Sequence, residues 1–111
     1  MKRYAVKRNG RNKTVAILNY DEENKIYTID VPENVSEKEA PFMISLFLQK
    51  GIRHVDSMWS FRWVQSRVIP NSRQNIGEIL RVNGMRSYDE HELLVKNEGR
   101  SCQDEFHIEA L

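Results

Sequence analysis

Residues 3–31 read RYAVKRNGRNKTVAILNYDEENKIYTIDV and contain three segments rich in β-branched and aromatic residues. The first two segments are separated by Asn9-Gly10, a pair that tolerates positive φ and commonly forms the turn of a hairpin. The polar run at 21–24 supplies a second turn. In the third segment apolar and polar residues alternate until Pro32. The pattern predicts an antiparallel β-meander over about residues 3–31.

The chain beyond Pro32 has the periodicity of helices over about residues 36–97. Residues 36–39 have the form of a capping box, and the first helix is expected from Ala40 to Lys50, with Pro41 in its first turn and Gly51 as its terminator. Apolar side chains cover nearly its whole circumference, which predicts burial on most sides. Three further helices are expected at 56–67, 73–82 and 87–97, the last opened by a capping box at 87–90.

The C-terminal segment alternates again, with Phe106, Ile108 and Ala110 separated by His107 and Glu109. This period of two predicts a final strand over about residues 105–110 that returns to the N-terminal sheet. The sequence therefore predicts one α+β domain over 1–111, with a β-meander, three to four helices and a C-terminal strand.

The composition fits a soluble globular protein, since 40% of the 111 residues are hydrophobic and 30% are charged. The single Cys102 excludes an intramolecular disulfide and points to a reducing, cytoplasmic location. No apolar run approaches the roughly 20 residues of a membrane-spanning helix. We therefore expect no membrane association.

The net charge of +1 conceals two opposed blocks. Residues 1–20 carry six basic side chains and no acidic one, whereas residues 21–40 carry seven acidic side chains and two lysines. A basic face on the N-terminal strands is typical of a small nucleic-acid-associated protein. Adjacent blocks of opposite sign also suit neighbouring strands that neutralise one another. The second interpretation predicts weak nucleic-acid binding or none.

Residue patterns that carry catalysis are absent. His54, His91 and His107 lie far apart in the sequence, and none has the partner spacing of a zinc motif. Cys102 lacks a second thiolate nearby, and no glycine-rich phosphate loop is present. We expect no enzymatic activity, no bound metal and no cofactor.

The segment Met58-Trp59-Ser60-Phe61-Arg62-Trp63 gives the predicted helix at 56–67 two apolar sides. Trp59, Trp63 and Arg67 follow one another at intervals of four, so they lie along one side of the helix. Phe61, Val64 and Val68 lie on a neighbouring side. One side would pack in the core, and the other could contact a protein partner, because Trp and Arg dominate interface hot spots. Core packing of both tryptophans is the alternative.

A family resemblance covers most of the chain. The order of a β-meander, Trp63-Val64, Val68-Ile69-Pro70, a helix from Arg73 to Gly84, and an acidic-capped helix ending in Leu93-Leu94 resembles the N-terminal subdomain of HipA-type toxin kinases. A turn at Gly99 and a strand to Ile108 complete the likeness. The chain departs from the family at Pro70-Asn71-Ser72 and 101–104, and the kinase domain has no counterpart in it.

The resemblance implies a bacterial toxin–antitoxin component that binds a protein partner. In some systems of this kind a short protein similar to the subdomain is separate from the kinase, docks on it and restrains it. The partner implied here is a HipA-like Ser/Thr kinase. The residues expected to bind it are Trp59, Trp63, Arg67 and Arg73.

Overall fold

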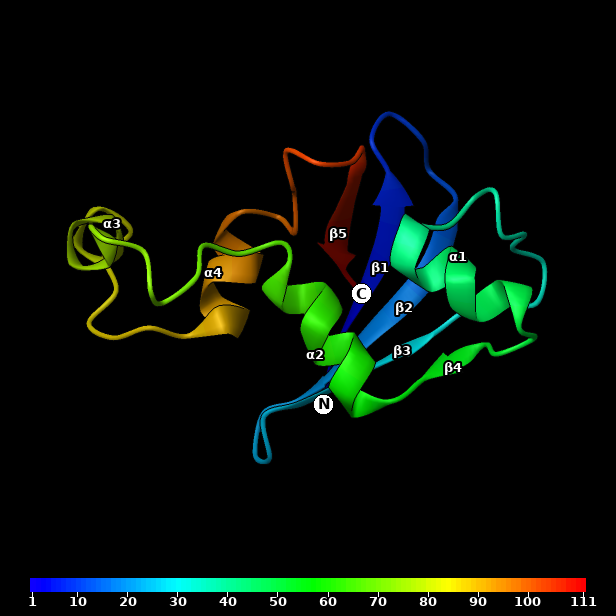
Figure 1. The fold of residues 1–111 in the computed structure, drawn as a ribbon, viewed down its shortest axis with the longest axis horizontal. Coiled ribbons are helices and arrows are strands. Elements are labelled where there is room, and N and C mark those ends of the chain that lie inside the picture. The colour runs from blue at the N-terminus through cyan, green and yellow to red at the C-terminus, as the bar shows by residue number, and fades with distance from the viewer.

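The computed structural model describes residues 1–111 and contains a five-stranded antiparallel sheet with four helices (Figure 1). The strands lie in the order β4-β3-β2-β1-β5. The chain is thus an α+β protein whose N-terminal meander and C-terminal strand share one sheet, which confirms the predicted fold class. The strands are β1 (Lys2–Arg8), β2 (Thr14–Asp21), β3 (Ile26–Asp30), β4 (His54–Val55) and β5 (Phe106–Ala110).

The return of the C-terminus to the sheet depends on a close approach at Gly99. Strand β5 pairs antiparallel with β1, so that Ile108 lies opposite Val6. Gly99 has φ +64°, and a Cβ atom on it would lie 2.8 Å from Cγ2 of Ile108. Both the left-handed backbone and the missing side chain are therefore needed where the chain leaves the last helix.

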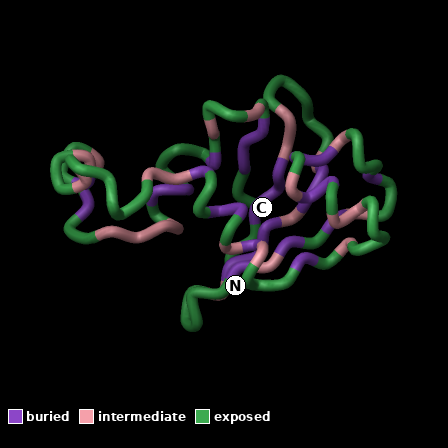
Figure 2. Tube along the Cα trace, in the orientation of Figure 1, coloured by how far each residue is buried: buried purple, intermediate pink, exposed green.

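The helices are arranged in two groups. Helices α1 and α2 lie against the sheet, whereas α3 projects away from it with α4 between α3 and the sheet (Figure 1). The apolar sides of α1, α2 and α4 join the sheet in one cluster of 18 buried residues, which includes Ile44, Val64 and Leu94. Figure 2 shows this buried centre and the exposed chain around α3. The helices are α1 (Phe42–Gln49), α2 (Ser57–Gln65), α3 (Ile76–Val82) and α4 (Glu90–Lys96).

A second, smaller cluster attaches α3 to the rest of the protein. It consists of buried Leu80, Met85 and Leu93, with Val68 and Tyr88 packed against it. The α3 helix begins at Ile76 and not at Arg73 as predicted, because the chain from Pro70 forms turns before it becomes helical.

Two more of the predicted helix starts are wrong for reasons of local chemistry. Residues 36–39 do form the reciprocal contact of a capping box, with Ser36 N donating to Glu39 Oε1 at 3.0 Å. This contact stabilises a turn and does not start a helix. Ala40 precedes a proline, which disfavours the helical conformation at Ala40. Helix α1 therefore begins at Phe42. Helix α4 is capped by Asp89, which accepts from Glu92 N at 3.0 Å, and not by Ser87.

The prediction that the first helix is buried on most sides is also wrong. Only Ile44 and Ser45 of α1 are buried, and Phe42 is 78% exposed. A short helix on a sheet is covered on one side, and no other element of this small protein covers the opposite side. Strand β4 was not expected, because two residues carry no periodic pattern; it pairs His54 with Asp30 and Val55 with Ile29. None of the four helices has the length and the apolar composition that a membrane span requires.

Candidate protein-interaction site

The four residues expected to bind a partner do not form one surface. Trp63 and Arg67 are only 2% and 5% exposed and belong to the protein interior, so the hypothesis of a surface that includes them is corrected. Trp59 is half-buried, and Arg73 is exposed in a different part of the molecule. For Trp63 the alternative of core packing holds, because α2 turns its Trp63 and Val64 side towards the sheet.

Arg67 holds the loop after α4 in place. Its Nε donates to the carbonyl of Gly99 at 2.5 Å, and its two terminal nitrogens donate to the two oxygens of Asp104, each at 2.7 Å. One of these nitrogens also donates to the carbonyl of Phe106 at 2.9 Å. The guanidinium lies 4.7 Å from the ring centroid of Trp63. Arg67 thus joins α2 to both ends of the segment that leads into β5.

The electrostatics of Asp104 agree with this structural role. Partial burial works to raise the pKa of the carboxyl, but the hydrogen bonds from Arg67 and from the backbone of Phe106 outweigh it, and the pKa lies below its usual value. The carboxylate therefore stays charged and paired near neutral pH. Arg67 and Asp104 form a clamp within the fold and leave no charge free for a ligand.

An open apolar surface lies on α1 and α2. We call it the α1–α2 face, and it consists of Phe42, Met43, Leu46, Phe47, Met58 and Trp59. Within it a groove of about 190 Å³ runs between the helices and is lined by Met43, Leu46, Phe47, Lys50 and Trp59. Phe42 and Leu46 are exposed one turn apart on α1, and Met58 is exposed on α2. The sequence feature that indicates this face is the apolar circumference of α1, because a small protein has too few elements to cover such a helix on every side.

Trp59 is the residue of α2 that lines this groove. Its ring meets the ring of Phe47 edge-on with centroids 5.9 Å apart, and the guanidinium of Arg62 lies 4.8 Å from its centroid. Asp56 fixes the start of α2 by accepting from Trp59 N at 2.9 Å. A large aromatic with a polar rim and an arginine beside it is the composition typical of an interface hot spot.

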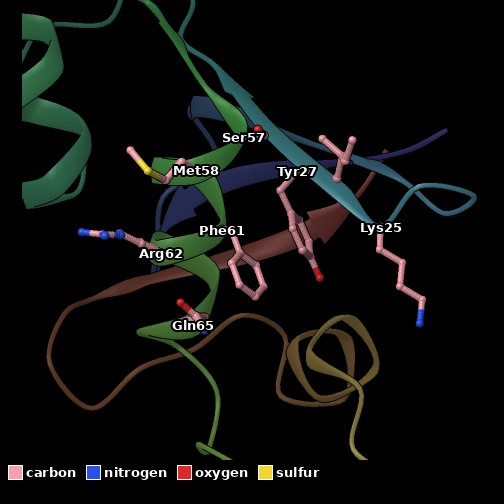
Figure 3. Close-up of a pocket in the computed structure, with 8 residues that line it drawn as sticks. Lys25, Tyr27, Ser57, Met58, Phe61, Arg62 and Gln65 are labelled. Carbon is pink, nitrogen blue, oxygen red and sulfur yellow. The ribbon is translucent and has the colours of Figure 1, made fainter.

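A second hollow lies on the other side of α2, against the beginning of β3. It has a volume of about 270 Å³, and Figure 3 shows the side chains that line it. Tyr27 and Phe61 form its inner wall with rings nearly parallel and centroids 6.0 Å apart. Met58 and Arg62 extend from α2 in the direction away from these two rings (Figure 3). The exposed ridge of α2 therefore has a concave surface on each side.

Arg73 lies in a third groove, of about 380 Å³, between the chain after α2 and the end of α4. Lys96, Arg100 and the exposed Cys102 line the same groove, and no acidic residue does. Arg67 also lines this groove, and its guanidinium already donates four hydrogen bonds within the protein. This basic groove is separate from the α1–α2 face.

The basic side chains of the N-terminal strands are mostly paired with acids. Lys2 lies 3.5 Å from Glu22, Lys7 lies 3.1 Å from Glu109, and Arg8 lies 3.4 Å from Glu105. Lys13 donates to Glu39 at 2.5 Å, and this bond lowers the pKa of Glu39 to about 2. Four of the six basic residues thus have acidic partners, two of them from the acidic block at 21–40 and two from β5 and the residue before it.

The three histidines have separate structural partners. His91 Nε2 lies 2.7 Å from the hydroxyl of Tyr4, and burial lowers the pKa of its imidazole. His54 contacts Asp30, and His107 contacts Asn9 and Glu109. No group of three or more His, Cys, Asp or Glu side chains is close enough to hold a metal ion.

We expect metal analysis of the purified protein to find no stoichiometric zinc. Cys102 is the only thiol that could bind zinc, and it is exposed without a group of further ligands around it. One equivalent of zinc that is lost on Cys102→Ala would contradict this prediction.

Comparisons with known protein families, with curated proteins and with solved structures give no match.

Proposed function

We propose that this chain is a non-catalytic module that binds a protein partner through the α1–α2 face. The observation that carries the proposal is the 78% exposure of Phe42, one turn of α1 away from Leu46, which lines an apolar groove together with Trp59. Large apolar side chains that lie exposed near one another keep apolar surface in contact with water. Such patches commonly mark sites where another molecule binds and covers them. Lys50 and Arg62 at the rim supply the polar border of an interface.

The resemblance to the N-terminal subdomain of HipA-type kinases supports a specific partner, a HipA-like Ser/Thr kinase that lacks this subdomain. In this proposal the chain docks on the kinase and restrains it. The contact residues are then Phe42, Leu46, Met58 and Trp59, with Trp63 and Arg67 acting only by holding α2 in place.

The test is to mix the purified chain with such a kinase, encoded beside it, and to follow kinase autophosphorylation. We expect autophosphorylation to fall as the chain approaches one equivalent, with a stable complex on size-exclusion chromatography. Unchanged autophosphorylation and separate elution at micromolar concentrations would refute the kinase as partner.

Nucleic-acid binding is the second function class, and we expect it to be weak. The ion pairs of the N-terminal strands leave Arg11 as a basic residue of that block with neither an acidic partner nor a side-chain hydrogen bond. A gel-shift titration at physiological salt is expected to show no binding below micromolar concentration. Sequence-selective, sub-micromolar binding would favour a DNA-binding protein over the partner module.

A further inference from the structure

A fourth concave site lies on the α4 side of the Tyr27–Phe61 pair. It is a cavity of about 210 Å³ between β2, β3, α2 and the start of α4. Four aromatic rings from four separate parts of the chain line it, together with two carboxylates. The lining consists of Tyr20, Lys25, Tyr27, Phe61, Tyr88, Asp89, Glu90 and His91.

The rings are held rigidly by stacking on one another. The centroids of Tyr20 and Tyr27 are 4.6 Å apart, and Tyr20 stacks on His91 at 4.1 Å. Phe61 continues the row on the other side of Tyr27 at 6.0 Å. A pre-formed wall of this kind needs no reorganisation when a flat apolar or delocalised group enters.

Two hydroxyl groups at this wall have no partner in the protein. Tyr20 and Tyr27 are only 5% and 3% exposed, yet neither hydroxyl forms a hydrogen bond within the chain, and neither is sealed from solvent. By contrast, the hydroxyl of Tyr4 meets His91, and that of Tyr88 donates to the carbonyl of Ile69 at 2.6 Å. In Figure 3 the hydroxyl of Tyr27 lies at the end of the ring remote from β3, on the side of α4. Both oxygens are open to solvent, so a ligand that donates hydrogen bonds can reach them in the cavity and replace their water.

The charge of the lining is negative. Glu90 forms no ion pair, and neither does Asp89, although one oxygen of Asp89 caps α4. Lys25 at the rim offsets one of the two carboxylates, and burial keeps His91 neutral. Burial raises the pKa values of Tyr20 and Tyr27, and the nearby carboxylates of Asp89 and Glu90 raise them further. The tyrosines are thus neutral and sit in a negative potential.

We propose that this cavity binds a guanidinium group, as found in an arginine side chain or in a free guanidine compound. A guanidinium is planar, donates five hydrogen bonds and accepts none, and it stacks on aromatic faces. It matches a site with aromatic walls, two unpartnered hydroxyl oxygens and an unpaired carboxylate. An ammonium is compact and strongly hydrated and gains less from the rings. The site lies across α2 from the groove of the α1–α2 face and does not depend on the function proposed for that face.

The test is a titration of the full chain with capped arginine (N-acetyl-arginine methylamide), followed by the NMR signals of the aromatic rings. We expect saturable shifts at Tyr20, Tyr27, Phe61 and Tyr88. Capped citrulline has nearly the same shape without the charge and is expected to cause no shifts. A parallel titration with methylguanidinium distinguishes the sources: comparable affinity indicates a free guanidine compound, and markedly tighter binding of capped arginine indicates a protein side chain.

Two variants remove the proposed contacts without removing a bond of the fold. Tyr27→Phe deletes a hydroxyl that the protein does not use, and Glu90→Gln deletes one charge from the cavity. Each is expected to weaken binding of capped arginine roughly tenfold, since a hydrogen bond to a charged group is lost. Glu92→Gln changes an exposed carboxylate in the same turn of α4, outside the cavity, and is the matched control.

Thermal melts show whether each variant folds, and Tyr20→Phe replaces any variant that does not. Equal shifts with arginine and citrulline would overturn the proposal, because the cavity would then be merely apolar. An absence of ring shifts with wild-type protein at millimolar capped arginine would overturn it too, as would unchanged affinity in both Tyr27→Phe and Glu90→Gln.

Discussion

Replacing Arg67 with methionine is expected to lower the free energy of unfolding by about 3 kcal/mol, measured by urea denaturation. Methionine keeps the packing against Trp63 but leaves Asp104 and the carbonyls of Gly99 and Phe106 without their donor. Removing one partner of a buried pair usually costs about 3–5 kcal/mol. The lower end applies because the side chain of Asp104 is 29% exposed.

The control for this variant is Arg62→Met, on the same helix. Arg62 is exposed and contacts only the face of Trp59, so its loss should cost less than about 1 kcal/mol. An Arg67→Met protein as stable as the Arg62→Met protein would show that the clamp contributes nothing to the fold.

The loss of unfolding free energy caused by Arg67→Met should also depend on pH. The pKa of Asp104 is lowered in the folded protein, mainly by Arg67 acting against the effect of burial. The stabilisation is therefore fully present above the unfolded value of about 3.9 and is lost as the pH falls through the folded value. The difference in stability between wild type and Arg67→Met is expected to be smaller at pH 2 than at pH 7.

Replacing Trp63 with alanine is expected to cost about 3–5 kcal/mol, the range for emptying a buried aromatic site. Trp63 is 2% exposed in the main core, whereas Trp59 is half-buried beside Phe47. Trp59→Ala should therefore cost less, about 1–2 kcal/mol. Thermal melts of the two variants measure this difference. Equal losses would contradict the assignment of Trp63 to the core and Trp59 to the surface groove.

The strands and the helix starts show what the sequence can and cannot predict. Strands β1 and β2 follow from β-branched and aromatic residues around the Asn9-Gly10 turn, and β3 and β5 follow from alternation over five residues. The cap at Asp56 follows from its position before an apolar run. The capping-box pattern at 36–39 predicts a helix from Ala40, but Pro41 restricts the backbone of Ala40, and α1 begins at Phe42. Strand β4 is too short to carry a pattern.

The candidate site was harder to predict because it depends on contacts between distant residues. The spacing of Trp59, Trp63 and Arg67 placed them correctly on one side of a helix, but spacing does not give depth. Arg67 is buried because Asp104, 37 residues later, and the carbonyl of Gly99 meet it there. Arginine is rarely buried, so its sequence position alone suggested a surface. The exposure of Phe42 likewise could not be predicted from the local sequence, because it results from the absence of any element packed over that side of α1.

The affinity of the chain for the HipA-like kinase, measured by isothermal titration with two matched variants, tests the central claim most directly. Phe42→Ser removes the most exposed side chain of the α1–α2 face, and Val82→Ser removes an 80% exposed apolar side chain on the distant α3. Both should melt like wild type, because little buried area is lost. The account predicts that Phe42→Ser weakens binding about tenfold or more, as at an interface hot spot, and that Val82→Ser does not. Wild-type affinity in Phe42→Ser would contradict it.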